Sequence, residues 1–415
     1  MEVSAAPCLD TNKIRRVVWV MREFHISRPA LCCVLAWSLI LSLCGIGNAL
    51  DLNLLLPIDY ASYDGHRAQY DMALTDGAAH VVYTKSGNVY YAVATKDNLT
   101  WNVTNLGPGS WPTIASDINN NVMVAFENGG TIYGAGTSTG WTPTPILGGI
   151  PGGKPILSSP FFTSGWQMVV EGDYDGDPRD EIVRLVNAGS GWSGPELLLD
   201  GWYDSGFGNY FRQPSIAAFA DGSYSLAYQF DNWGGQARWS ERWAGVTGPG
   251  TNQQIGIGGL SWNWPEIQLS RRSVSAISHD GSPRAVFACA IGNKLYAAIN
   301  EGEGWNWLLY DYGSGSAPAV SWTGAVYADL NGNLHFVTSD EQGVIDEQIT
   351  YQGSQLTGTA PLIWSMEDKF FLFRDENGML QFGACIAPVP EPASIVSLLT
   401  GTVGLLLAAG YRRRK

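Results

Sequence analysis

The body of this chain repeats itself at an interval of about 43 residues. The segment from Tyr83 to Ala92 matches the segment from Phe126 to Ala135, and Pro112 is separated from Pro155 by the same interval. No window of a dozen residues keeps the 3.6-residue period of an amphipathic helix, whereas short alternating or apolar stretches recur between Gly-containing turns. The sequence therefore predicts a body of short strands, built from units that bury their apolar faces against one another.

A period in the forties with about four strands per unit is typical of β-propeller blades. We therefore expect an all-β, seven-bladed β-propeller with an N-terminal signal helix and a C-terminal transmembrane helix. Six blades, eight blades or an open arrangement are the alternatives. The units begin near Tyr70, Trp111, Pro155, Pro214, Pro265, Pro318 and Pro361.

The last unit lacks a fourth strand, because the chain runs from Cys385 directly into a Pro-rich tail. The apolar segment from Leu50 to Leu56 belongs to no unit of its own. We expect this segment to supply the missing strand and close the ring. Closure would remove strand edges that otherwise invite aggregation.

Tryptophan recurs near the start of the fourth strand in several units, where we expect it to pack between neighbouring blades rather than to bind sugar. A second group could form either an extra packed hairpin or an aromatic ligand-binding surface. The first group is Trp101, Trp141, Trp192 and Trp305, and the second, kept as candidate ligand-binding residues, is Trp233, Trp239, Trp243, Trp262 and Trp264.

The first 49 residues are typical of a signal peptide, with an apolar run from Ala30 to Ile46 and small residues up to a cleavage position after Ala49. Either Met1 or Met21 could be the true start. We therefore divide the chain into a leader (1–49), a propeller (50–387) and a C-terminal sorting segment (388–415).

The C-terminal segment carries an uncharged apolar run of 18 residues, Ala393 to Gly410, followed by four basic residues that end at Lys415. A helix of this length reaches about 27 Å, close to the hydrocarbon thickness of a bilayer. The basic end would stay on the cytoplasmic side. This pattern predicts attachment to a membrane through the C-terminal helix.

The residues Val389, Pro390, Glu391 and Pro392, followed by that apolar run and basic end, resemble the PEP-CTERM sorting signal. The resemblance covers only this tail. It implies export to the cell envelope, recognition and cleavage by an exosortase-type membrane protease, and delivery to the cell surface or an extracellular matrix. On this resemblance the helix anchors the protein only before processing.

The charge of the chain limits its partners. With 24 Lys and Arg against 38 Asp and Glu, the formal net charge is −14, and it becomes more negative once the basic leader and tail are removed. Such a surface argues against nucleic acid as a partner. Outside the leader, Cys289 and Cys385 could form one disulfide or remain two buried thiols.

One acidic loop has the spacing of a metal site, because oxygens at its positions 1, 3, 5 and 9 can surround a hard cation and Gly176 allows the turn. The loop resembles the calcium loops of FG-GAP repeats, although Pro178 and Glu181 depart from that pattern. The resemblance implies Ca²⁺ as a cofactor. A solvated acidic turn is the alternative. The expected ligands are Asp173, Asp175, Asp177, the carbonyl of Arg179, and Glu181.

No nucleophile elbow, phosphate-binding loop or metal-binding histidine pair occurs in the sequence. We therefore expect an exported, non-catalytic surface or matrix propeller, not an enzyme, that binds an exopolysaccharide or a surface protein. The alternative is a secreted propeller glycoside hydrolase or sialidase-like enzyme, for which Arg212, Arg242, Arg271 and Tyr210 could be the catalytic residues.

Overall fold

A computed structural model describes the chain over its repetitive body. The described residues are 49–63, 68–159, 165–176, 181–200, 202–204, 207–218, 224–231, 235–242, 251–254, 266–269, 285–291, 294–300, 307–321, 324–340, 343–365 and 368–386. The segments predicted to be a leader (1–49) and a sorting signal (388–415) lie outside this set, apart from Ala49. In the described part of the chain no helix is long and apolar enough to cross a membrane.

The described strands form seven antiparallel sheets, numbered here in chain order. The first sheet contains β3 (Tyr70–Thr75), β4 (Ala78–Lys85), β5 (Asn88–Thr95) and β6 (Asn98–Pro108). The second contains β7 (Ser110–Ser116), β8 (Val122–Asn128), β9 (Thr131–Gly136), the short 3₁₀ helix η1 (Thr137–Thr139) beside it, and β10 (Thr144–Gly148). The third contains β11 (Lys154–Ser158), β12 (Trp166–Gly172), β13 (Glu181–Asn187) and β14 (Glu196–Leu199).

The remaining sheets are also built from consecutive strands, with extra strands in the fourth and sixth sheets and a strand from the N-terminal segment in the seventh. The fourth contains β15 (Trp202–Asp204), β16 (Phe207–Ala218), β17 (Tyr224–Asp231), β18 (Gly235–Arg242) and β19 (Thr251–Gln254). The fifth contains β20 (Glu266–Leu269), β21 (Ala285–Ile291), β22 (Lys294–Asn300) and β23 (Trp307–Ser314). The sixth contains β24 (Ser316–Ser321), β25 (Gly324–Ala328), β26 (Leu334–Asp340), β27 (Gly343–Tyr351), β28 (Ser354–Gln355) and β1 (Ala49–Leu52). The seventh contains β29 (Thr359–Ser365), β30 (Lys369–Arg374), β31 (Met379–Cys385) and β2 (Leu54–Tyr60).

Tight turns explain why consecutive strands pair. Lys85 pairs with Asn88 across a two-residue turn in which Ser86 and Gly87 have φ values of 50° and 74°. Two consecutive positive φ values define the type I′ turn, whose twist matches that of the flanking strands. The turn between β8 and β9 uses Gly129 and Gly130 in the same way. The hairpins predicted from the sequence are thus confirmed at both positions.

The recurring prolines mark a bulge in the inner strands. Trp111 and Ala360, which precede two of these prolines, have φ values of 53° and 46°, and each lies inside a break in strand register. Proline cannot donate a backbone hydrogen bond, so a bulge is where a strand accommodates it. The prolines at such breaks are Pro112, Pro214, Pro318 and Pro361.

The inner strands follow one another in a closed circuit. β3, β7, β11, β16, β20, β24 and β29 each contact the next, and β29 contacts β3. Side chains of one inner strand bond the backbone of its neighbour: the Ser116 hydroxyl donates to the Leu74 carbonyl at 2.6 Å, and the Ala218 N–H donates to the Ser158 hydroxyl at 3.0 Å. The body is therefore a propeller-like all-β fold.

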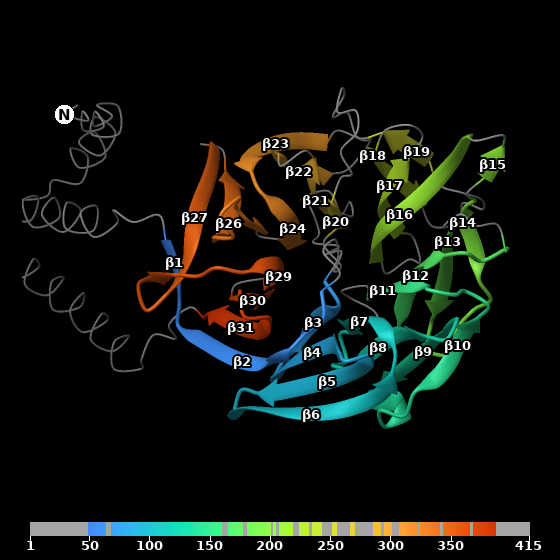
Figure 1. Cartoon of the computed structure of the whole chain (residues 1–415), viewed down its shortest axis with the longest axis horizontal. Helices are drawn as coiled ribbons and strands as arrows, with labels where there is room; N and C mark the ends of the chain where they lie inside the picture. The colour runs from blue at the N-terminus through green and yellow to red at the C-terminus, as the bar shows by residue number, and fades with distance from the viewer. Residues whose placement is uncertain are drawn as a thin grey trace, which may run out of the picture. The chain divides into compact units, whose positions relative to one another are not determined.

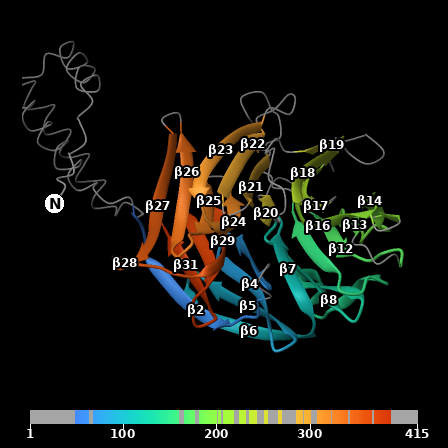
Figure 2. The same cartoon turned by 45° about the horizontal axis from the view of Figure 1, so that its top comes forward.

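The chain closes this circuit through β2, which pairs with β31 from Leu54 opposite Ala384 to Tyr60 opposite Met379. Figures 1 and 2 both show the blue β2 beside the red β31. The prediction that the N-terminal segment supplies the fourth strand of the last unit is confirmed. The strand begins at Leu54 rather than Leu50, because β1 instead extends the neighbouring sixth sheet.

Polar contacts fasten the seventh sheet to the first. The Lys85 ammonium group lies 2.7 Å from Asp59 Oδ1, and the Tyr83 hydroxyl donates to Asp59 Oδ2 at 3.2 Å. The buried Tyr70 hydroxyl donates to the Ala360 carbonyl at 2.7 Å. The sixth, seventh and first sheets also share one hydrophobic core, which includes Leu52 and Tyr83.

Three of the first group of tryptophans pack as expected. Trp101 meets Phe382 of the seventh sheet edge-on at 5.5 Å between ring centroids, and Trp141 stacks on Tyr91 of the first sheet at 3.6 Å. Trp192 packs against the core between the second and third sheets. Trp305 lies outside the described residues.

Packing of the N-terminal segment into the core shared by the sixth, seventh and first sheets predicts an effect on stability. Leu52 is 2% exposed and belongs to the shared core, so Leu52→Ala should lower the free energy of unfolding by about 2–5 kcal/mol. Leu330→Ala makes the same chemical change at a side chain that is 68% exposed and should alter stability by less than about 0.5 kcal/mol. Denaturant titration of both variants measures the difference. Equal effects would mean that the N-terminal segment is not part of the folded body.

Candidate functional site

A cavity of about 560 Å³ lies between the seventh and first sheets and reaches the β7–β8 turn. Leu54 and Leu56 of the closing strand β2 form part of its wall. The other walls come from the β3–β4, β5–β6 and β29–β30 turns and the strands beside them. Its size is in the range of sites for small molecules or sugar units.

The walls of this cavity are aromatic and aliphatic. Trp364 meets Phe370 edge-on at 6.1 Å between centroids, and Phe370 stacks on Phe382 at 6.0 Å. Leu99 and Ile118, which are 48% and 51% exposed, also line it. Exposed aromatic and aliphatic groups of this kind can cover the apolar face of a sugar ring.

Three carboxylates line the same cavity: Asp76, Asp117 and Asp368. Asp117 is buried, and its oxygens accept the N–H groups of Asn119 and Asn121, both at 2.9 Å, so that it holds the β7–β8 turn. Asp76 is exposed and accepts a bond from the Asn120 side chain at 3.1 Å. Asp117 is thus committed to its turn, whereas Asp76 and Asp368 line the cavity at exposed and half-buried positions.

A buried histidine lies behind the wall of the cavity. His80 Nε2 is 3.0 Å from the hydroxyl of Thr75, which lines the cavity, and Nδ1 is 2.6 Å from the hydroxyl of Tyr91. Burial lowers the pKa of His80 to about 4, because removing the imidazolium from water disfavours its charged form. His80 is therefore neutral near pH 7 and positions Thr75 and Tyr91 through hydrogen bonds.

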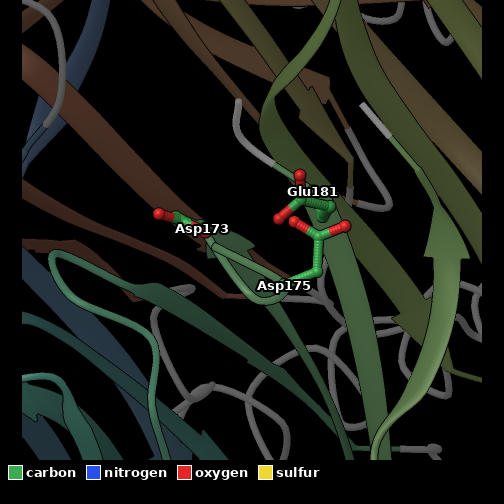
Figure 3. Close-up of side chains that lie close together, drawn as sticks. All are labelled: Asp173, Asp175 and Glu181. Atoms are coloured by element: carbon green, nitrogen blue, oxygen red, sulfur yellow. The ribbon is translucent and has the colours of Figure 1, made fainter. Parts of the chain in front are cut away.

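A second group of acidic residues lies at the β12–β13 turn. One carboxylate oxygen from each of Asp173, Asp175 and Glu181 lies within 4.8 Å of the other two (Figure 3). Asp173 Oδ1 accepts the Gly176 N–H at 2.7 Å, which holds the turn. The other two expected ligands, Asp177 and Arg179, lie outside the described residues.

Glu181 is the buried member of this cluster, with a side chain that is 0% exposed. Its Oε2 accepts the Tyr174 N–H at 2.7 Å, whereas Oε1 is buried without a hydrogen-bond partner in the described part of the chain. Burial raises the pKa of Glu181 to about 7, and repulsion from Asp175, Asp173 and Asp200 acts in the same direction, while the bond from Tyr174 opposes it.

The structure describes the remaining residues that the sequence suggested only in part. Trp239 lies in β18, where it pairs with Ala227 and Gln253. The other four candidate ligand-binding tryptophans lie outside the described residues, as does Arg271 of the sialidase-like set. Cys385 is a free thiol.

The cavity could not be predicted from the sequence. Its carboxylates and aromatic residues come from turns that are far apart in the chain, and each turn has an ordinary composition. Leu99 and Ile118 stand beside turns and are exposed in the structure. Their exposure cannot be recognised from the sequence alone.

Comparison with known proteins concerns the fold. No family model and no curated protein matches the chain. Among solved structures, the polysaccharide lyase Uly1 matches with a TM-score of 0.50 and 8% identity, over 80% of this chain and 99% of the lyase. An α-L-arabinanase of Penicillium chrysogenum gives 0.46 and 9%, over 80% and 97%. The NanB sialidase of Streptococcus pneumoniae gives 0.40 and 12%, over 79% and 70%.

These comparisons correct one prediction. The sequence predicts a non-catalytic binding or structural propeller and not an enzyme. That prediction is contradicted: the polysaccharide lyase Uly1, which the chain resembles in fold at a TM-score of 0.50, is an enzyme, so the fold gives no ground for excluding catalysis. Motifs close together in the sequence could not indicate this, because a propeller assembles its sites from separate turns.

The burial of His80 predicts a dependence of stability on pH. Between about pH 6.5 and pH 4 the unfolded chain binds a proton at His80 that the folded protein does not bind, so the free energy of unfolding falls as the pH falls. The expected loss is on the order of 3 kcal/mol. Denaturant titrations of the wild type and of His80→Gln at several pH values isolate this contribution. A constant stability difference between the two proteins across this range would contradict the assignment.

Proposed function

We propose that the chain is an exported, seven-bladed β-propeller enzyme that hydrolyses glycosidic bonds in a polysaccharide. The observation that carries this proposal is the cavity beside the closing strand, where Asp76 and Asp368 line a space walled by Trp364 and Phe370. Each of the seven sheets is one blade in this proposal.

The chemistry of glycoside hydrolysis needs two carboxyl groups on either side of the bond that breaks. One donates a proton to the leaving oxygen, and the other attacks the sugar carbon or activates a water molecule. Asp76 comes from the β3–β4 turn and Asp368 from the β29–β30 turn, so the pair spans the junction between the first and last blades.

The other residues of the cavity suit the binding of a saccharide. Trp364 offers an aromatic surface for a sugar ring, while the amide of Asn120 and the ammonium group of Lys96 can bond hydroxyl or carboxylate groups. The likeness of the fold to that of a polysaccharide lyase is consistent with this proposal, but it is the lining of the cavity that supports it.

We also propose that the tail directs the enzyme to the cell envelope. This proposal rests on the sequence of Val389 to Pro392 with the apolar and basic residues that follow. In it, an exosortase-type protease is the processing partner. Mass spectrometry of the mature protein should give a chain that ends near these residues, and a mature protein that retains Lys415 would contradict the proposal.

The proposed hydrolase is tested with single carboxylate-to-amide substitutions. Asp368→Asn and Asp76→Asn should each reduce the release of reducing ends from a cleaved polysaccharide by about 100-fold or more, since a catalytic acid or base contributes about that much. Asp97→Asn removes the same charge at an exposed residue of the β5–β6 turn that does not itself line the cavity and should keep full activity. Trp364→Ala should mainly raise KM, because it removes sugar contacts rather than proton transfer.

The assay should use neutral and acidic polysaccharides and record ultraviolet absorbance as well as reducing ends. Products without an unsaturated uronic acid are expected. Unsaturated products would instead identify an elimination reaction and contradict hydrolysis. Undiminished activity in both folded aspartate variants would show that this cavity is not the active site.

A further inference from the structure

The acidic cluster at the β12–β13 turn lies at the opposite end of the strands from the cavity. The cavity is lined by turns that join first to second and third to fourth strands of a sheet, whereas this turn joins a second strand to a third. In an antiparallel sheet these two kinds of turn lie at opposite ends. The acidic cluster is therefore a separate site from the proposed hydrolase cavity.

We infer that Asp173, Asp175 and Glu181 bind a Ca²⁺-sized divalent cation. The inference starts from Glu181, which is completely buried yet has one carboxylate oxygen, Oε1, without a hydrogen-bond partner in the described residues. A buried carboxylate oxygen that has lost water and gained nothing destabilises the fold. A cation at this oxygen removes that cost.

The spacing of the oxygens fits the ion. Two ligands on opposite sides of Ca²⁺ lie about 4.6–5.2 Å apart, because each Ca–O distance is about 2.3–2.6 Å. The three carboxylate oxygens fall within 4.8 Å of one another. Mg²⁺ demands near-ideal octahedral geometry and gives up its water ligands reluctantly, so a group of several protein carboxylates suits Ca²⁺ better. A set made only of carboxylates also favours a hard ion over zinc or copper.

The two carboxylate oxygens of Glu181 have different roles. Oε2 is bound by the N–H of Tyr174, which fixes the position of the carboxylate, and Oε1 is left for the metal. Tyr174 itself packs against the core between the second and third sheets. Binding of the cation is thereby connected to the packing of two neighbouring sheets, so occupancy should stabilise the whole body.

Terbium is a suitable probe, because it occupies calcium sites and its emission is excited through a nearby aromatic ring such as that of Tyr174. The wild-type protein should show saturable Tb³⁺ emission that Ca²⁺ displaces and an equal concentration of Mg²⁺ does not. Glu181→Gln and Asp175→Asn should weaken Ca²⁺ binding, measured by calorimetry, by about 10-fold or more, and Ca²⁺ should raise the melting temperature of the wild type more than that of either variant.

Glu376→Gln is the matched control. It removes one carboxylate at an exposed position in the β30–β31 turn, the corresponding turn of the seventh sheet, and should bind as the wild type does. Asp175 is exposed, so Asp175→Asn tests the site even if Glu181→Gln does not fold. Unsaturable emission, or equal binding by wild type and Asp175→Asn, would overturn the inference. Neither result depends on catalysis, so failure of the metal site would not count against the proposed hydrolase.

Discussion

The pairing of β2 with β31 is the constraint on which the rest of this fold depends. It joins Leu54 to Ala384 near the two ends of the body. Beside this pairing the side chain of Asn53, 333 positions from Ile386, donates to the Ile386 carbonyl at 2.7 Å and accepts the Ile386 N–H at 3.1 Å. The entropic cost of closing so long a loop rises only with the logarithm of its length. In return, β2 covers the edge of β31, and the sixth, seventh and first sheets bury one shared core.

The same closure creates the cavity. β2 contributes Leu54 and Leu56, the seventh sheet contributes Trp364 and Phe370, and the first sheet contributes Asp76. A chain that ended before the last sheet, or began after β2, would lack one of these walls. The proposed catalytic residues therefore lie where the two ends of the body meet, while the acidic turn of the third sheet lies at the other end of the strands.

The local parts of the fold could be predicted from the sequence, because turns and strand periods are determined by neighbouring residues. Ser86 and Gly87 form a type I′ turn between adjacent strands, and prolines recur near the start of most units, at or beside the inner strands. The fourth strand of the last sheet was predictable by counting strands. Its register was not, because β1 and β2 divide the N-terminal segment between two sheets.

The candidate sites divide in the same way. Asp173, Asp175 and Glu181 come from one turn, so their spacing in sequence indicated a cluster, although it gave no sign that Glu181 would be completely buried. Asp76 and Asp368 come from opposite ends of the body and resemble ordinary turn residues in the sequence. Only the closed circuit of strands brings them to one cavity, which is why motifs in the sequence gave no indication of the proposed hydrolase site.

Hydrogen–deuterium exchange of the intact protein tests the closure most directly. If β2 is an integral strand of the last sheet, backbone amides of Leu54 to Tyr60 that bond to β31 should exchange as slowly as those of β31 itself. Exchange of the β2 amides at the rate of an unstructured chain, with β31 still protected, would contradict the closed ring and, with it, the cavity that the ring creates.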